Sequence, residues 1–113
     1  MSACSLGLVA TMAAAATAPT ASADAASQRM WAKHCADCHG KDGRSQTRLG
    51  RKSGAPDLTD KKVQAKLTDD DIFKAIKLGR KNAKGEEKME AFGGAIADPE
   101  ITALIAYVRS LAR

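Results

Sequence analysis

The sequence lacks several features that mark common classes of protein. Its 113 residues include only one Trp, one Tyr and two Phe, so a large aromatic core is excluded. It has no Gly-rich phosphate-binding loop, no internal repeat and no basic stripe with interleaved aromatic residues, which makes nucleic-acid binding a poor fit. No stretch alternates apolar and polar residues as a β-strand would. The chain therefore predicts one small all-α domain without a nucleic-acid partner.

Long hydrophobic runs are also absent, and this decides how the N-terminus is interpreted. Residues 1–23 carry no charge, and the apolar run at 6–18 is too short and too weakly hydrophobic for a membrane span. The segment ends in Ala-Ser-Ala at Ala23, the small-x-small pattern of a signal-peptidase site. We therefore expect a signal peptide cleaved after Ala23 and a periplasmic domain over 24–113 with no membrane span. No Lys or Arg precedes the apolar run, which is consistent with a start codon further upstream. The alternative to a signal peptide is a disordered Ala-rich tail on a cytosolic protein.

Cysteine is scarce, and its positions limit what it can do. Of the three cysteines, Cys4 lies in the expected signal peptide, which leaves Cys35 and Cys38 in the domain. A disulfide between them would close a very short loop and would restrict the unfolded chain little. A domain of about 90 residues with few large apolar side chains needs another source of stability. A bound prosthetic group would supply it.

What the chain does contain is a set of helical patterns. Apolar residues at helical spacing and flanking capping residues predict helices over 24–38, 68–78 and 98–112. Two loops rich in Gly and charged residues separate them, at 40–60 and 80–88. We expect the first and last helices to cross.

Local signals support the helix starts and one contact. Thr68 followed by three Asp residues predicts a capped start for the second helix. Asp98 followed by proline predicts the start of the third, with Asp98 as N-cap. Trp31 in the first helix is expected to pack against the last helix, near Tyr107 or Val108.

The motif HCADCHG, residues 34–40, concentrates two thiols and two imidazoles. On a helix, Cys35 and Cys38 project from one face, and His39 lies one turn beyond Cys35. C-x-x-C-H is the attachment signal for c-type haem, in which the thiols bond to the vinyl groups and the adjacent imidazole binds the iron. We therefore predict one covalently attached haem c, held at Cys35 and Cys38 with His39 as an iron ligand.

Two other kinds of site use a similar motif. A zinc knuckle needs four ligands, and the domain offers no distant Cys or His to complete the tetrahedron. A thioredoxin-like redox pair normally occurs in a β-α-β setting, which the sequence lacks. Both alternatives account for fewer features of the chain than haem does.

Iron bound to one histidine needs a ligand on its other face, and methionine is the candidate type. Met30 falls within the first predicted helix, where core packing is the simpler role. Met89 lies 50 residues beyond His39 in a polar loop, so the chain can wrap round the haem and deliver the thioether from the opposite side. We predict Met89 as the distal ligand.

These features together resemble the class I c-type cytochromes, small monohaem electron carriers, over almost all of residues 26–112. The stretches that resemble the family's first helix and attachment loop, proline segment, methionine loop and last helix are MWAKHCADCHGKDG, GAPDLTD, KMEAFGG and DPEITALIAYVRSL. The resemblance implies a cytochrome c-like fold, with three or more helices wrapped around the haem. It also implies that the carbonyl of Pro56 accepts the Nδ1 proton of His39, which would orient the ring.

The sequence departs from this pattern after Met89, where Glu90 stands in place of the usual proline. We expect a looser loop there and a carboxylate that favours oxidised iron. With His and Met on the two faces, the iron has no open position, so we expect an electron carrier and not an enzyme. It would shuttle electrons between exported or membrane-bound redox partners, alone or as a subunit of a larger oxidoreductase. The alternative is a haem enzyme or small-ligand sensor in which Met89 is displaceable.

The formal net charge of +5 bears on the partner. Basic residues from segments expected to surround the haem are Lys41, Lys81, Lys84 and Lys88. We expect a monomer that docks on redox partner proteins carrying acidic patches. Because Glu86, Glu87 and Glu90 interleave with these lysines, a surface of mixed sign is the alternative.

Overall fold

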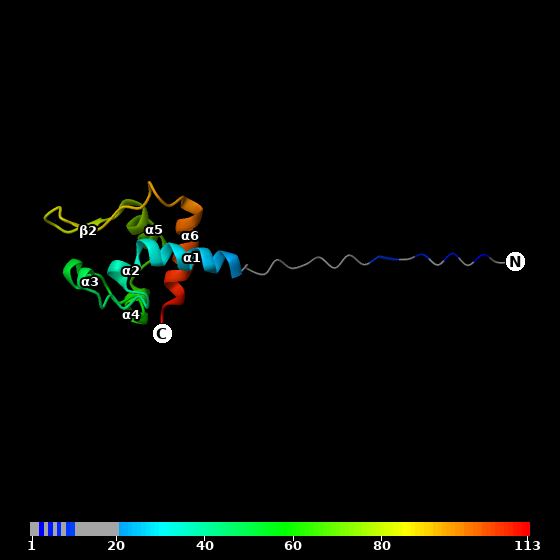
Figure 1. Cartoon of the computed structure of the whole chain (residues 1–113), viewed down its shortest axis with the longest axis horizontal. Coiled ribbons are helices and arrows are strands. Elements are labelled where there is room, and N and C mark those ends of the chain that lie inside the picture. Colours follow the sequence, from blue (N-terminus) through cyan, green and yellow to red (C-terminus); the bar gives the residue numbers. More distant parts are fainter. Residues whose placement is uncertain (1–2, 4, 6, 8, 11–20) are drawn as a thin grey trace.

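The computed structural model describes residues 3, 5, 7, 9, 10 and 21–113. Over these residues its elements are α1 (Ala21–His34), α2 (Ala36–His39), α3 (Arg48–Ser53), α4 (Lys61–Ala65), α5 (Asp69–Leu78), β1 (Arg80–Lys81), β2 (Glu87–Met89) and α6 (Asp98–Ser110) (Figure 1). Helices dominate the described part of the chain, which confirms the predicted all-α class.

Most of the expected signal peptide, residues 1–23, lies outside the described residues, as does Cys4. Helix α1 begins at Ala21, just ahead of the expected cleavage point after Ala23. Among the residues that the structure describes, no helix combines the length and the apolar character that crossing a membrane requires.

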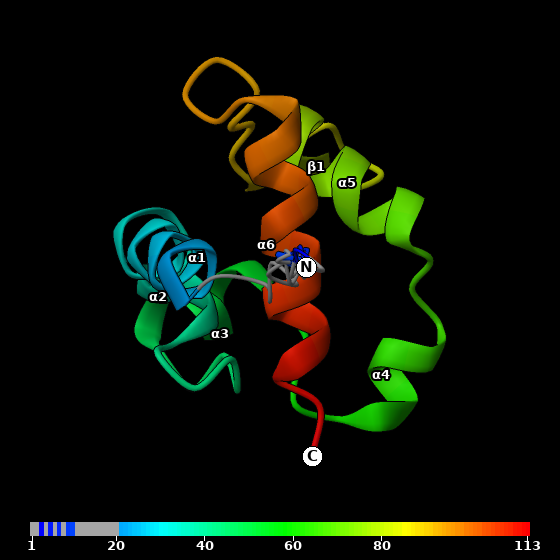
Figure 2. The ribbon, with the colours of Figure 1, turned by 90° about the vertical axis from the view of Figure 1, so that its right-hand side faces the viewer.

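The first and last helices pack against each other, and Figure 2 shows α1 end-on beside α6. The indole of Trp31 is 3% exposed, and its centroid lies 5.3 Å from that of Tyr107 on α6, as predicted. Its Nε1 donates to the carbonyl of Gly40 at 3.0 Å. On α6, Ile101 and Leu104 are completely buried, and each contributes roughly 2–3 kcal/mol relative to an exposed side chain. This contact places the start and the end of the domain in one core.

The helix starts follow local capping chemistry. The Thr68 hydroxyl accepts from the amide of Asp71 at 3.0 Å, and the Asp71 carboxylate accepts from the amide of Thr68 at 2.9 Å. This capping box confirms the predicted start of α5. Helix α6 begins at Asp98 itself, so the predicted N-cap is wrong by one residue. Ala97 occupies the cap position, and its amide donates to the Glu100 carboxylate at 3.1 Å.

The predicted helix over 24–38 is divided between α1 and α2 at Cys35. The hydrogen bonds nevertheless continue across the division: the Cys35 amide donates to the Trp31 carbonyl at 2.9 Å, and the His39 amide donates to the Cys35 carbonyl at 2.9 Å. The two helices are therefore one helical run with a local distortion at the first cysteine of the motif.

The predicted loop at 40–60 contains a short helix, and another follows it. Helix α3 is capped by Thr47, whose hydroxyl accepts from the amide of Gly50 at 2.8 Å. Helix α4 is capped by Asp60, whose carboxylate accepts from the amide of Lys62 at 2.8 Å. Each helix is too short to show a hydrophobic period, which is why the sequence pattern missed both.

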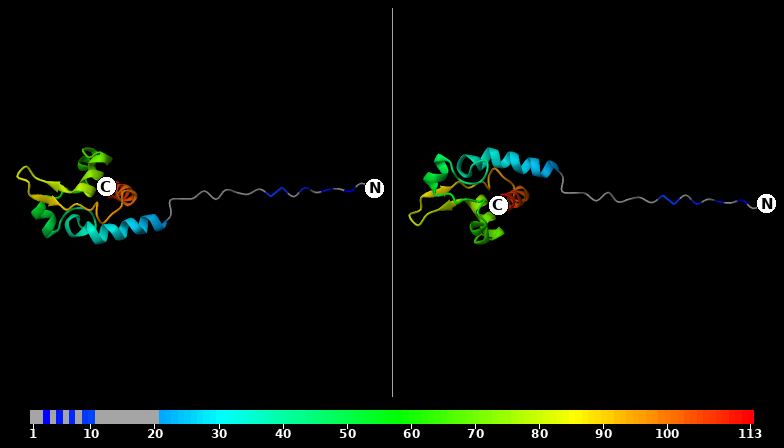
Figure 3. Two further views of the ribbon diagram at one scale, coloured as in Figure 1. Left: turned by 90° about the horizontal axis from the view of Figure 1, so that it is seen from above. Right: turned by 90° about the horizontal axis from the view of Figure 1, so that it is seen from below.

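The expectation of a loop without strands at 80–88 is wrong. Strands β1 and β2 pair antiparallel, with Arg80 opposite Met89. At the turn, the side-chain oxygen of Asn82 accepts from the amides of Lys84 and Glu86 at 3.0 and 2.9 Å. Both views of Figure 3 show this ribbon and α3 at the same end of the domain.

Candidate functional site

All five predicted site residues line one cavity of about 1080 Å³. Cys35, Cys38 and His39 reach it from the end of the first helical run. Pro56 reaches it from the segment after α3, and Met89 from the end of β2. A volume of this size accommodates a large prosthetic group. The fold therefore brings together residues that the sequence separates by more than fifty positions.

The rest of the lining is mostly apolar and belongs to the core of the domain. The buried core residues that also line the cavity are Trp31, Leu58, Ile72, Ile76, Leu104 and Val108. The cavity is thus an extension of the hydrophobic core. A group bound in it would receive apolar contacts from α1, α5 and α6 at once.

The two thiols do not have the properties of a redox pair. Burial and the neighbouring Cys38 raise the pKa of the Cys35 thiol to about 11. Burial, with Asp37 and Glu90 nearby, raises the pKa of the Cys38 thiol as well. A dithiol that exchanges electrons needs the opposite, a lowered pKa that yields thiolate at neutral pH. The site therefore fits cysteines committed to covalent attachment better than it fits the thioredoxin-like alternative.

The zinc alternative is not supported by the described residues either. Within 21–113 and the few described positions before them, no three His, Cys, Asp or Glu side chains are grouped to hold a metal ion. His34, the residue next to Cys35 in the motif, packs its ring edge-on to Phe92 with centroids 5.4 Å apart. The imidazole of His34 thus packs against an aromatic ring from the segment after Met89, and not against another candidate metal ligand.

His39 is prepared to act as a ligand. Burial lowers the pKa of its imidazole, which keeps the ring neutral, the form that offers a lone pair to a metal. Its Nδ1 is buried and has no hydrogen-bond partner, an arrangement that is costly unless the folded, loaded protein satisfies it. A histidine that binds iron through Nε2 and keeps its proton on Nδ1 fits these observations.

The hydrogen bond expected between His39 and Pro56 is not formed in this structure. The Pro56 carbonyl instead accepts from the hydroxyl of Ser45 at 2.6 Å. The amide of Ser45 in turn donates to the carbonyl of His39 at 2.8 Å. Sequence reasoning missed Ser45, because a single serine in a charged loop gives no periodic or motif signal.

The segment that carries Met89 is fixed by backbone contacts. After the ribbon, the amide of Phe92 donates to the Ile76 carbonyl at 2.8 Å, and that of Gly93 donates to the Lys77 carbonyl at 3.1 Å. These two bonds join the segment to the last turn of α5. This pairing begins two residues beyond Glu90, and the looser loop expected at Glu90 itself stays a prediction.

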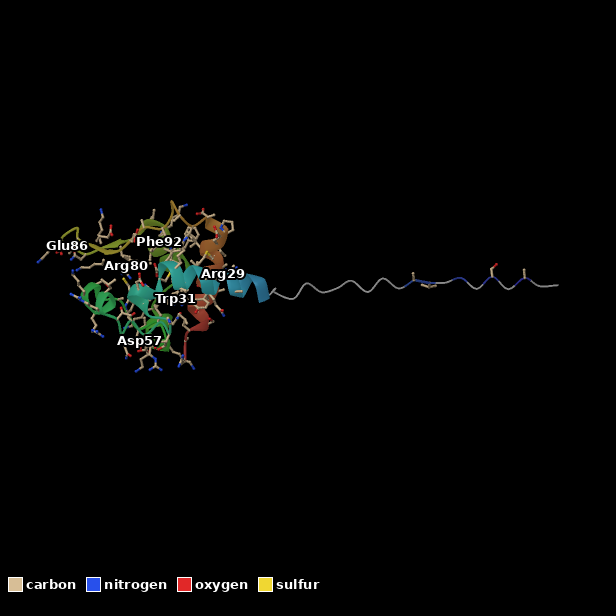
Figure 4. All side chains as sticks on the ribbon, in the orientation of Figure 1. Arg29, Trp31, Asp57, Arg80, Glu86 and Phe92 are labelled. Carbon is tan, nitrogen blue, oxygen red and sulfur yellow. The ribbon has the colours of Figure 1, made fainter. Side chains whose placement is uncertain are left out.

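The rim of the cavity carries charges of both signs. Arg80, Lys81 and Lys88 of the ribbon line it, together with Glu90. Figure 4 shows Arg80 near the base of the ribbon and Glu86 toward its far end. At the same end of the domain (Figure 3), α3 adds further exposed basic residues and no acidic one. Of the four lysines considered above, Lys41 and Lys84 are exposed but do not line the cavity.

Comparison with known proteins gives consistent results. The family model described as cytochrome c oxidase, cbb3-type, subunit III, matches residues 22–108. Among solved structures, the chain is similar to the KustC0563 c-type cytochrome, with 31% identity and a TM-score of 0.67, over 77% of this chain and 98% of that one. It is also similar to a tyrosine-to-phenylalanine mutant of that protein, with 32% identity and a TM-score of 0.64, over 75% of this chain and 96% of that one. No curated protein matches.

Proposed function

The chain belongs to the c-type cytochromes, and from this we propose that it is an electron carrier with one haem, attached at Cys35 and Cys38 and ligated by His39 and Met89. Membership of the family implies covalently bound haem c and haem-based electron transfer. The ligand set rests on one observation, the convergence of these four side chains on a single apolar cavity.

Each side chain has a defined task in this proposal. When bound, haem c supplies a reversible one-electron couple at its iron. Cys35 and Cys38 hold the group at the end of the first helical run, and the neutral imidazole of His39 offers Nε2 from the same side. Met89 offers a thioether, which favours the reduced state. If His39 and Met89 both hold the iron, no position would remain for a substrate, which is why we propose a carrier and not an enzyme.

Methionine substitution tests the ligand set. Met89→Ala should abolish the weak far-red absorption band of ferric thioether ligation and should lower the reduction potential. Met30→Ala is the matched control, because Met30 packs against the core and does not line the cavity. Loss of the band in Met30→Ala, with the band retained in Met89→Ala, would refute the assignment.

Carbon monoxide separates the carrier from the alternative of a haem enzyme or ligand sensor. A firmly held Met89 should leave the absorption spectrum of the reduced protein nearly unchanged when carbon monoxide is added at neutral pH. Rapid and complete conversion to a carbon monoxide complex would favour the alternative.

We also propose that residues 1–23 are a signal peptide and that residues 24–113 act in the periplasm. The family model supports this because it begins at residue 22, beside the expected cleavage point after Ala23. Mass spectrometry of protein purified from the exporting cell should give a mature chain beginning at Asp24. An intact N-terminus on haem-loaded protein would contradict the proposal.

The partner is proposed to be a redox protein with an acidic docking patch. Arg80, Lys81 and Lys88 stand at the rim of the cavity, where a partner would approach. The matched family model is described as an oxidase subunit, which suits a chain that works beside a larger oxidoreductase. Lys88→Glu should slow electron transfer and weaken its dependence on salt, whereas Lys61→Glu on α4 should not. Equal effects of the two variants would argue against docking at this rim.

A further inference from the structure

We propose that Ser45 is a positioning residue for His39 and that its hydroxyl tunes the reduction potential through the carbonyl of Pro56. The inference rests on the proposed ligation of iron by His39 and on a hydrogen bond from its Nδ1 to the Pro56 carbonyl in the haem-loaded protein. Ser45 is 6% exposed and bridges two segments of the site. Its amide donates to the His39 carbonyl at 2.8 Å, and its hydroxyl donates to the Pro56 carbonyl at 2.6 Å.

The backbone of Ser45 shows that this bridge is specific. With φ of +60°, Ser45 is the one non-glycine residue of the described chain in the left-handed region. A side chain there is disfavoured, and such a conformation persists only where the surroundings enforce it. The two hydrogen bonds of Ser45 supply that constraint.

The surroundings of Ser45 leave the bridge little freedom. Two residues further on, the Thr47 hydroxyl donates to the Cys38 carbonyl at 2.6 Å. A Cβ at Gly50, in the first turns of α3, would lie only 2.7 Å from the Ser45 carbonyl oxygen. The short segment from Ser45 to Thr47 therefore holds the carbonyls of Cys38, His39 and Pro56 from behind the cavity wall.

The Ser45 hydroxyl affects which hydrogen-bond acceptor is left for the Nδ1 proton of His39. This atom is buried and has no partner, and a carbonyl oxygen has two lone pairs. Ser45 already occupies one of them on Pro56, so an Nδ1 proton would have to share the acceptor with a short hydroxyl bond. A carbonyl that already accepts one hydrogen bond accepts a second one less strongly, so the Nδ1–H bond of the imidazole is less polarised. The ring then donates less charge to iron, which favours the reduced state and raises the potential.

Removal of the hydroxyl tests this in the haem-loaded protein. Ser45→Gly deletes the hydroxyl and relieves the backbone, and Ser45→Ala deletes the hydroxyl alone. Both should lower the reduction potential and move the His39 Nδ1 proton downfield in the NMR spectrum of the reduced protein. Thr47→Ala is the control, because it loosens the same segment through Cys38 without touching the Pro56 carbonyl.

The outcomes separate this proposal from the proposed function. If the Ser45 variants keep the far-red band but show the potential and proton shift of the wild type, or move them no more than Thr47→Ala does, Ser45 has no tuning role. If the wild type itself lacks the far-red band or a protected Nδ1 proton, the ligand assignment fails and the role of Ser45 fails with it.

Discussion

Gly79 determines, at the scale of single residues, where Met89 lies. Its φ of +72° and ψ of −175° fall in a region essentially restricted to glycine. A Cβ built on it would lie 2.5 Å from the Met89 carbonyl oxygen and 2.9 Å from the Ala91 amide nitrogen. The end of α5 can approach the methionine segment this closely only because residue 79 has no side chain.

Gly79→Ala should therefore displace Met89 and destabilise the protein. We expect a loss of about 2 kcal/mol in the free energy of unfolding and a weakened far-red band. Gly94→Ala is the matched control in the following loop, since a Cβ there meets nothing within 4 Å and its φ is not positive. Urea unfolding and the ferric absorption spectrum measure both effects, and equal behaviour of the two variants would refute this role for Gly79.

The capping carboxylate of α5 predicts a dependence of stability on pH. Hydrogen bonds from the Thr68 amide and hydroxyl hold the pKa of Asp71 below its usual value of 3.8. A lowered carboxyl pKa stabilises the fold above the ordinary pKa, and the contribution is lost as the pH falls through the folded value. Asp71→Ala should thus be less stable than the wild type at pH 7, and the difference should shrink below pH 3.8.

The control for this prediction is Asp70→Ala, in the same turn of α5. Asp70 forms an exposed ion pair with Lys74 but does not cap the helix. Urea unfolding at pH 7 and under acid conditions should show a larger and more pH-dependent loss for Asp71→Ala. A pH-independent difference between wild type and Asp71→Ala would contradict the assignment.

Residue by residue, the site was only partly readable from the sequence. The spacing of Cys35, Cys38 and His39 carries its own chemical meaning, because all three lie on one helical run. Ser45 and Gly79 give no such sequence signal, because their roles come from contacts with Pro56 and Met89, about ten positions further along the chain. Such roles depend on how segments meet, which a local pattern does not encode.

At the scale of elements, a buried amide joins α4 to the last helix. The Gln64 side chain donates to the carbonyls of Leu58 and Val108 at 2.7 and 2.8 Å, and it accepts from Arg109 at 2.9 Å. Arg109 also donates to the Leu67 carbonyl at 2.6 Å. The segment from Leu58 to Leu67, whose two ends line the cavity, is thereby tied to α6.

Replacement of this amide should loosen the segment. Gln64→Leu would remove the donor to the Leu58 carbonyl, one of the two donors to the Val108 carbonyl and one acceptor of the Arg109 guanidinium. We expect a loss of about 2–3 kcal/mol in the free energy of unfolding. Gln28→Leu, at an exposed position of α1, should change it by less than about 0.5 kcal/mol. Denaturant titration measures the free energy of unfolding of the two variants. Similar values would show that the Gln64 side chain does not stabilise the contact between α4 and α6.

The elements themselves were predictable in proportion to their length. α5 and α6 bury a repeated apolar face, and the sequence pattern located the ends of both helices to within two residues. α3, α4 and the ribbon contain too few residues for a period, and they are set by the caps of Thr47 and Asp60 and by the turn at Asn82. The polar sequences of these elements are equally typical of a loop.

At the scale of the whole molecule, the cavity and the core share one set of side chains. Ile72, Ile76 and Leu104 belong to both. The protein without its haem should therefore be short of apolar contacts.

Cys35→Ala combined with Cys38→Ala should abolish covalent haem and leave a largely unfolded chain. Circular dichroism and thermal denaturation of the purified variant provide the measurement, with haem content determined as the pyridine complex. The single variant Met89→Ala, which should keep covalent haem, controls for loss of a cavity residue. A cooperative, native-like transition in the haem-free double variant would show that the core is sufficient by itself.

The placement of the attachment residues also has a consequence for the order of assembly. Cys35, Cys38 and His39 are neighbours in any helical or extended conformation, whereas the wall that contains Met89 exists only after the ribbon has formed and docked on α5. Burial raises the pKa of the Cys35 thiol to about 11, so this sulfur is a weaker nucleophile inside the finished domain than on an open chain. Capture of the cofactor is thus favoured early, while the C-terminal half is still unstructured, and enclosure is the step that completes the molecule.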